Sequence, residues 1–155
     1  MGLFLGRMAR LLPGFWLGGL LCVAGLATPA PFALLAQADA GRVVGRILAQ
    51  EAYASLVLGV VIVMLERRAS ARAAAAGLGS QFGVGMALAL GAVFCTVAGY
   101  FGLQPLMAAA KAGQGALSFG QLHAISALFY ALKVVLVAVL AWRTAGQGVT
   151  QGPFS

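Results

Sequence analysis

Acidic residues are scarce in this sequence, and so is charge of either sign. The 155 residues include three Asp and Glu, ten Lys and Arg and one His, so charged residues make up 8% of the chain. Soluble domains carry about 25% charged residues. With 62% hydrophobic residues, a chain of this length has more apolar surface than a soluble core can bury. The composition excludes an ordinary soluble domain and predicts an integral membrane protein.

Histidine and cysteine are also rare. His123 is the only histidine, which excludes a haem held by two histidines of one chain. Cys22 and Cys95 both lie inside apolar runs, where cysteine usually behaves as a small hydrophobe and not as part of a disulfide framework. No phosphate-binding Gly-rich loop and no nucleophile elbow is present. We therefore expect a protein that is not an enzyme and holds no cofactor and no metal.

Four long apolar runs fill most of the chain. Each approaches the roughly 20 residues that a helix needs to cross the ~30 Å hydrocarbon core of a bilayer. The predicted fold is all-α, an integral membrane four-helix bundle in a single domain over residues 1–155. Its helices are expected at about 11–36, 47–65, 81–107 and 121–142, and the aperiodic segment 144–155 is expected to be disordered.

Two connecting segments and one alternative remain open. Residues 37–46 are interpreted as a short polar turn, and residues 69–80 are either helix or flexible link. The first run also resembles a secretory signal with an A-x-A site at Ala36-Gln37-Ala38. Because the run spans about 25 residues and signal cores span roughly 7–15, we expect a retained helix, kinked near Pro29 and Pro31.

The basic residues lie in short clusters between the apolar runs, as topology signals do, and this pattern argues against nucleic-acid binding. Counting them at each end predicts the orientation of the chain. One side holds Arg7, Arg10, Arg67, Arg68, Arg72 and Arg143, and the other holds Arg42, Arg46 and Lys111. The excess predicts that both termini are cytoplasmic in a multi-pass protein of a bacterial inner (plasma) membrane.

The last apolar run carries a polar face. His123, Ser126, Tyr130 and Lys133 fall within an arc of about 80° at 100° per residue. Lys133 would sit near mid-membrane, where an ionised side chain costs about 2.5–3.5 kcal/mol on insertion scales. This face is therefore expected to point inward, toward other protein or trapped water.

Glu51 is the only acidic residue well inside an apolar run. We hypothesise an ion pair between Glu51 and Lys133, and the alternative is that Glu51 meets the interfacial Arg42 or Arg46. The expected intramembrane polar cluster consists of Glu51, Ser55, His123, Ser126, Tyr130 and Lys133.

Small residues recur every fourth position in the third run. The predicted packing seam consists of Gly83, Ala87, Gly91, Cys95 and Gly99, and Gly79 precedes it. Such rows let helix backbones approach closely in lipid. Whether the seam meets a helix of the same chain or of a second copy is left open, and Gly14 and Gly18 offer a further small-xxx-small pair.

Three segments together resemble a known family: GGLLCVAGLATPAPFALL at 18–35, AGRVVGRILAQEAY at 40–53 and FGQLHAISALFY at 119–130. In this order they are similar to the bacterial branch of the transmembrane-protein-205-like family, a domain of unknown function (number 4149). The resemblance extends from Leu11 to Trp142 and implies four membrane helices without an established activity. The chain departs from the family pattern at Leu48, Tyr130 and Lys133, so no family role is carried over to Lys133.

Two functional interpretations follow. The first is a non-enzymatic membrane protein that associates with a second copy or serves as an accessory subunit of a membrane complex. The alternative is an ion or metal (copper-like) transport or resistance protein that uses Glu51, His123 and Lys133 along one intramembrane polar path. A soft metal could also meet donors at Cys22, Cys95, Met107 and His123. A eukaryotic member of the family that the chain resembles is associated with platinum-drug resistance, which also suggests metal handling. A wet cavity reaching Glu51 and His123 would favour transport, and a dry ion pair would favour the first interpretation.

Overall fold

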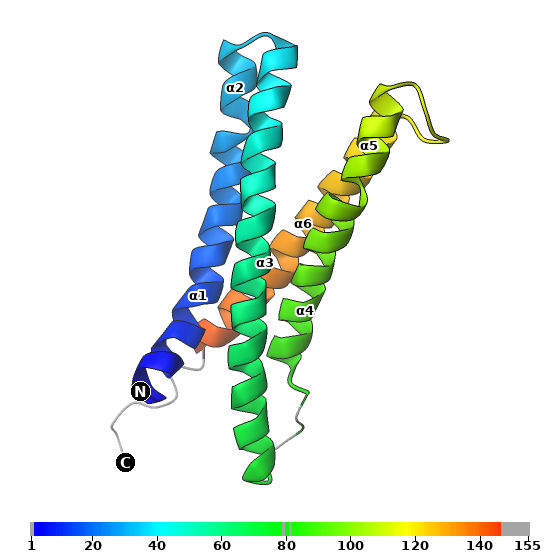
Figure 1. Ribbon diagram of the computed structural model, residues 1–155. Helices are drawn as coiled ribbons and strands as arrows, with labels where there is room; N and C mark the ends of the chain where they lie inside the picture. The colour runs from blue at the N-terminus through cyan, green and yellow to red at the C-terminus, as the bar shows by residue number, and fades with distance from the viewer. Residues whose placement is uncertain (1, 79, 81, 147–155) are drawn as a thin grey trace.

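Four long rods of helix make up the described part of the chain (Figure 1). The computed structural model describes residues 2–78, 80 and 82–146. Within these residues, four helical stretches are long and apolar enough to cross a membrane: Gly6–Leu34, Gln37–Ala75, Val84–Lys111 and Phe119–Gly146. The structure thus confirms the predicted all-α fold with four candidate membrane spans.

The first rod continues through its prolines by widening one turn. It consists of α1 (Gly2–Cys22), the π-helical segment η1 (Val23–Ala27) and α2 (Pro29–Leu34). The amide of Thr28 donates to the Val23 carbonyl five residues back at 2.9 Å, and the Thr28 hydroxyl donates to the same oxygen at 2.8 Å. A π turn makes room where the ring of Pro29 would clash with a normal helical carbonyl. Near Pro29 and Pro31, where a kink was expected, the helix widens locally into the π turn.

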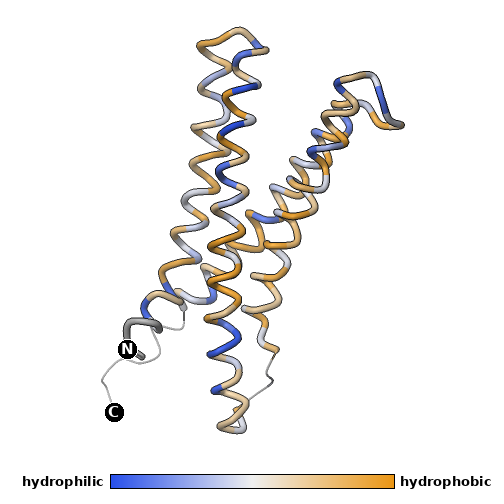
Figure 2. Tube along the Cα trace, viewed as in Figure 1, coloured by the Kyte–Doolittle hydropathy of each residue, from blue (hydrophilic) through white to orange (hydrophobic). Residues whose placement is uncertain are grey.

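The second rod, α3 (Gln37–Ala75), is longer than the apolar run that predicted it. Its 39 residues span about 58 Å at 1.5 Å per residue, nearly twice a hydrocarbon core. The segment interpreted as a polar turn, 37–46, is its first part, and most of the open segment 69–80 is its last. Arg, Gln and Ala are good helix formers. The polar residues at the two ends of α3 therefore end the apolar run, but the helix continues through them. Figure 2 shows the hydrophilic positions gathered toward its two ends.

Gly77 stops α3 in a Schellman arrangement. Its φ of 72° is in the left-handed region, the amide of Leu78 donates to Ala73, and the amide of Gly77 donates to Ala74. These bonds satisfy carbonyls that a helix end leaves free. Gly113 (φ 74°) ends the third rod in the same way.

The third rod consists of α4 (Val84–Thr96), the π-helical segment η2 (Val97–Gly102) and α5 (Gln104–Lys111), and again a π segment precedes a proline, Pro105. The fourth is α6 (Phe119–Gly146).

The structure corrects the disordered segment predicted for 144–155, because residues 144–146 are helical and Thr144 is buried. Residues 147–155 lie outside the described residues.

The four rods form a ring in which α1 packs on α3 and α6, and α4 packs on the same two helices. In the described part of the chain, the backbones of α1 and α4 do not approach closely, and neither do those of α3 and α6. These are the two diagonal pairs of the bundle. The dry core takes residues from all four rods: Trp16, Leu20, Ile62, Ala89, Ala92, Val137 and Leu140.

The outer faces of the rods are apolar. Phe15, Val57, Phe94 and Leu128, one from each rod, are all exposed. Soluble monomers rarely expose apolar surface on this scale, whereas lipid tails cover such surface without cost. The exposed side chains therefore indicate a bilayer environment.

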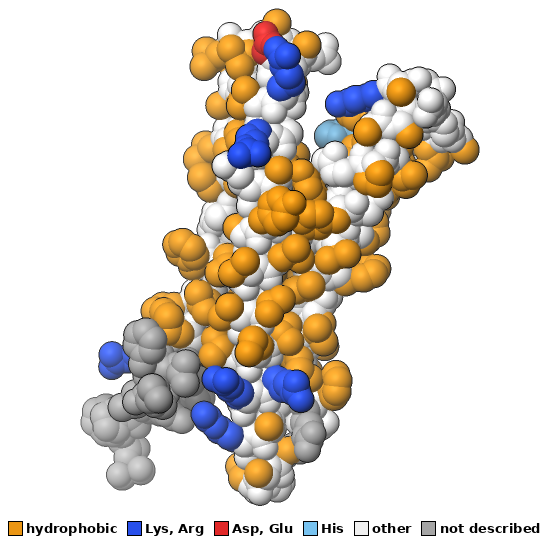
Figure 3. Space-filling model, viewed as in Figure 1, with side chains coloured by type: hydrophobic (Ala, Val, Ile, Leu, Met, Phe, Trp, Pro, Cys, Tyr) orange, Lys and Arg blue, Asp and Glu red, His pale blue; other side chains and the backbone are white. Residues whose placement is uncertain are grey.

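The rods diverge toward the end that carries α2 and α5 (Figure 1). There α2 packs only on α3 and η1, while α5 packs only on α6 and η2, among the described residues. Figure 3 shows the resulting notch between the two arms, 29–50 on one side and 104–126 on the other. The arms meet where the Tyr53 and Phe101 rings contact edge to face, with centroids 5.3 Å apart.

Candidate functional site

An ion pair joins the two diagonal helices α3 and α6 inside the bundle. The ammonium nitrogen Nζ of Lys133 lies 2.8 Å from Oε1 and 3.0 Å from Oε2 of Glu51. The two side chains are only 3% and 8% exposed, respectively. Because each charge is removed from water and lipid alike, the pair compensates a desolvation that neither group could sustain alone.

A hydrogen-bonded chain extends the ion pair to the first rod. The Ser55 hydroxyl donates to Oε1 of Glu51 and accepts the indole N–H of Trp16 at 2.9 Å. Trp16 and Ser55 are 2% and 1% exposed. Three helices, α1, α3 and α6, are thereby tied together by one network. Within the described residues, no buried side-chain nitrogen or oxygen lacks a partner.

Tyr130 covers the remaining side of the ammonium. Its ring centroid lies 4.6 Å from Nζ of Lys133, a cation–π distance. Its hydroxyl donates to the backbone carbonyl of Leu20 at 2.8 Å, which anchors α6 on α1. The ammonium of Lys133 thus lies between the carboxylate of Glu51 and the ring of Tyr130.

The rest of the predicted cluster lies apart. Ser126 donates to the Gly99 carbonyl at 2.7 Å and so ties α6 to η2. His123 is exposed and stacks on Phe119, with ring centroids 6.0 Å apart. The structure therefore brings Glu51, Ser55, Tyr130 and Lys133 together and leaves these two outside.

Trp16 belongs to the site although the sequence analysis did not name it. A buried tryptophan usually finds an acceptor for its indole N–H. The only tryptophan of the first apolar run was therefore a usable signal. The carbonyl of Leu20 has no such signal, because every residue carries one.

The seam of α4 packs largely against its own chain. A Cβ added at Gly91 would meet Leu136 of α6 at 3.1 Å, and at Gly99 it would overlap Phe129 of α6. At Gly83 it would meet the Ser70 hydroxyl of α3 at 2.7 Å. Cys95 is buried, but Ala87 is exposed. Most of the seam therefore faces helices within the bundle.

The soft donors do not gather. Cys22 is exposed on the first rod and Cys95 is buried on the third. Among the described residues, no three His, Cys, Asp or Glu side chains lie close enough to share a metal ion. The site as built can fix helices relative to one another, since its donors and acceptors are engaged with each other.

Comparison with known proteins gives a family without an assigned activity. No curated protein and no solved structure matches the chain. The sequence model described as "Domain of unknown function (DUF4149)" matches residues 11–116, which include both π segments and Glu51. Since the match covers more than half of the chain, the protein belongs to the DUF4149 family.

Proposed function

We propose that this multi-pass protein is a non-enzymatic component of a bacterial inner membrane that works by associating with a second copy of itself. The observation that carries the proposal is the buried, direct ion pair between Glu51 and Lys133. A conducting or transporting path needs charged groups that can exchange partners with an ion or with water. An ion pair closed by Ser55 and Tyr130 instead suits a rigid scaffold. The resemblance to the transmembrane-protein-205-like family, which brings no established activity for its bacterial members, is consistent with this proposal.

An unoccupied small-residue face supports self-association. Gly14 and Gly18 of α1 are exposed, and a Cβ added at either would meet no atom within 4 Å. Glycines four apart let the backbone of another helix approach closely, where packing drives association in lipid. Most of the α4 seam is already used inside the bundle. Gly41 and Gly45 of α3 are also exposed and without neighbours, but they lie beside Arg42 and Arg46, whereas Gly14 and Gly18 lie within an apolar run.

The self-association is tested by replacing Gly14 and Gly18 with Leu. We expect the purified wild type to run as a dimer or larger in mild detergent and the double variant as a monomer, because the leucines hold the backbones apart. The oligomeric mass is measured by light scattering with the detergent contribution subtracted. Gly19→Leu is the matched control, because Gly19 is also exposed and without neighbours but points about 100° away from Gly18. A monomeric wild type, or a control that dissociates equally, refutes self-association through α1.

The proposed orientation places both termini in the cytoplasm, supported by the excess of basic residues at that end. In a variant without its two cysteines, a cysteine at Gln114 is expected to react with a membrane-impermeant maleimide added to intact cells. A cysteine at Leu78, in the α3–α4 link at the other end of the bundle, is expected to react only after the cells are opened. The reverse pattern would show the opposite orientation.

A further inference from the structure

A cavity of about 520 Å³ opens at the end of the bundle opposite the notch. All four rods contribute to it: the start of α1, the last turns of α3, the start of α4 and the end of α6. Glycine and alanine make up nearly half of the residues that line it. Its size is within the roughly 300–1,000 Å³ of small-molecule sites. The polar cluster around Glu51 and Lys133 takes no part in it.

Charges of both signs line this cavity. Arg10 of α1 and Arg143 of α6 contribute guanidinium groups, and Glu66 of α3 contributes a carboxylate. In the described part of the chain, Glu66 has no cation within ion-pair distance and makes no side-chain hydrogen bond. Its carboxylate lies directly against Gly85, where an added Cβ would overlap Oε2. Arg143 lies close enough to interact with Glu66 electrostatically, but the two groups are not within ion-pair distance of each other.

The cavity also lies at the depth of phospholipid headgroups. Glu66 follows the last apolar residue of its run, Arg10 precedes the first apolar run, and Arg143 directly follows Trp142. Trp142 is 84% exposed, as expected for a tryptophan at the membrane–water interface. Lipid phosphates and amines are thus expected within reach of this cavity.

We propose that the cavity binds the headgroup of a phospholipid carrying both a phosphate and a primary ammonium, the chemistry of phosphatidylethanolamine. Arg10 and Arg143 hold the phosphate, because guanidinium groups match phosphate oxygens with paired N–H donors. Glu66 accepts the N–H groups of the ammonium, and Gly85 leaves room for its carboxylate. A phosphatidylglycerol headgroup engages the arginines alone, since it has no cation for Glu66.

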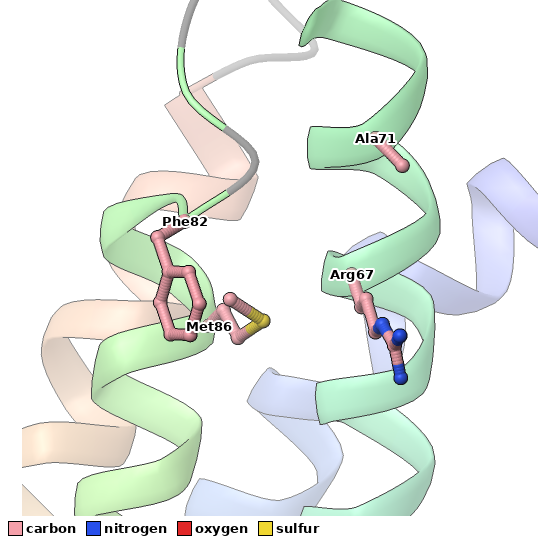
Figure 4. Close-up of a pocket in the computed structure, with 4 residues that line it drawn as sticks. All are labelled: Arg67, Ala71, Phe82 and Met86. Atoms are coloured by element: carbon pink, nitrogen blue, oxygen red, sulfur yellow. The ribbon is translucent and has the colours of Figure 1, made fainter.

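A neighbouring cavity provides the contrast. It measures about 460 Å³ and is lined by Arg67, Ala71, Phe82 and Met86 (Figure 4). It has one cation and no acid, so it lacks the paired charges. Arg67 adjoins Glu66 in the sequence but does not line the larger cavity. Arg67→Gln is therefore a matched control for loss of a positive charge at this end of α3.

The test uses the full chain, delipidated in detergent and given equal amounts of phosphatidylethanolamine and phosphatidylglycerol, with bound lipid counted by native mass spectrometry. We expect the ethanolamine lipid to be favoured roughly two- to fivefold, as a partly exposed ion pair allows. Glu66→Gln should abolish the preference, and Arg10→Gln with Arg143→Gln should reduce the binding of both lipids. Gly85→Ala should act like Glu66→Gln without changing any charge, because its Cβ displaces the carboxylate. Arg67→Gln should change nothing.

Equal binding of the two lipids by the wild type overturns the proposal, and so does a preference that survives Glu66→Gln. A loss of preference in Arg67→Gln as large as in Glu66→Gln also overturns it, because the effect would then be one of general surface charge. Soluble phosphoethanolamine is expected to bind more weakly than the lipid, because it carries the same charged groups without the acyl chains. Binding of phosphoethanolamine by the delipidated protein without binding of either lipid would refute the assignment to a lipid. Thermal unfolding of each variant confirms that the chain is folded when the lipids are counted.

Discussion

Removing either partner of the Glu51–Lys133 pair is expected to lower the free energy of unfolding by about 3–5 kcal/mol, because the other charge stays buried without its counterion. Lys133→Met leaves the carboxylate inside the bundle, and Glu51→Gln leaves the ammonium. Both side chains are nearly inaccessible, so neither water nor lipid headgroups can replace the lost partner. The measurement is unfolding by SDS titration, followed by circular dichroism.

The double variant distinguishes a true pair from two independent losses. Glu51→Gln combined with Lys133→Met should cost less than the sum of the single changes by about 2–3 kcal/mol, since no charge is left unpaired. The exposed Arg42–Asp39 pair is the control, with side chains 82% and 51% exposed. Asp39→Asn should cost about 0–1 kcal/mol. Additive losses at Glu51 and Lys133 would contradict the pair.

The ion pair was predictable because charges inside apolar runs are so few. With one acid well inside a run and one lysine near mid-membrane, burial cost alone favours bringing the two together. The network beyond them was less predictable. Ser126 and Tyr130 share a helix face with Lys133, yet Ser126 bonds to Gly99 of η2 while Tyr130 bonds to Leu20 of α1. Residues of one helix face have different partners here because the rods diverge along their length. The geometry of a single helix cannot show where that divergence begins.

Hydropathy predicted how many rods cross the bilayer but not how long they are. The apolar run of the second rod ends at Leu65, and α3 continues to Ala75. An apolar run measures the thickness of the hydrocarbon core, whereas helix length depends on propensity and on stop signals such as Gly77. For the same reason, hydropathy could not predict the cavity at the end of the bundle opposite the notch. In the sequence Glu66 only marks the end of an apolar run, whereas in the structure it also lines that cavity.

The seam shows a geometric limit of sequence reading. Residues four apart are separated by 400°, so each step drifts about 40° around an α-helix. Over five positions the row turns through about 160°, and it cannot face one partner throughout. The row is also not one regular α-helix, because Gly83 has extended backbone and Gly99 lies in η2. Its members accordingly have different neighbours: Gly83 meets α3, Gly91 and Gly99 meet α6, and Ala87 is exposed.

Gly99→Ala is expected to lower the free energy of unfolding by about 1–3 kcal/mol, the usual cost of overpacking a close contact. The added Cβ would overlap the Cβ of Phe129 and stand 3.1 Å from its Cγ. A Cβ atom cannot rotate away, so η2 and α6 must separate. Alanine is otherwise the better helix former by about 1 kcal/mol. Gly45→Ala, whose Cβ meets nothing within 4 Å, should therefore be neutral or stabilising in the same SDS titration.

Gly59 of α3 gives the complementary case. There an added Cβ would overlap Cγ2 of Val93 and stand 3.3 Å from the Trp16 ring. Because the nearest atom is a terminal methyl, Val93→Ala should rescue most of the loss caused by Gly59→Ala. Phe129→Ala should not rescue Gly99→Ala, since alanine keeps the Cβ that clashes. If Phe129→Ala rescued Gly99→Ala as fully, or if Gly99→Ala were as harmless as Gly45→Ala, the close approach of η2 to α6 would be refuted.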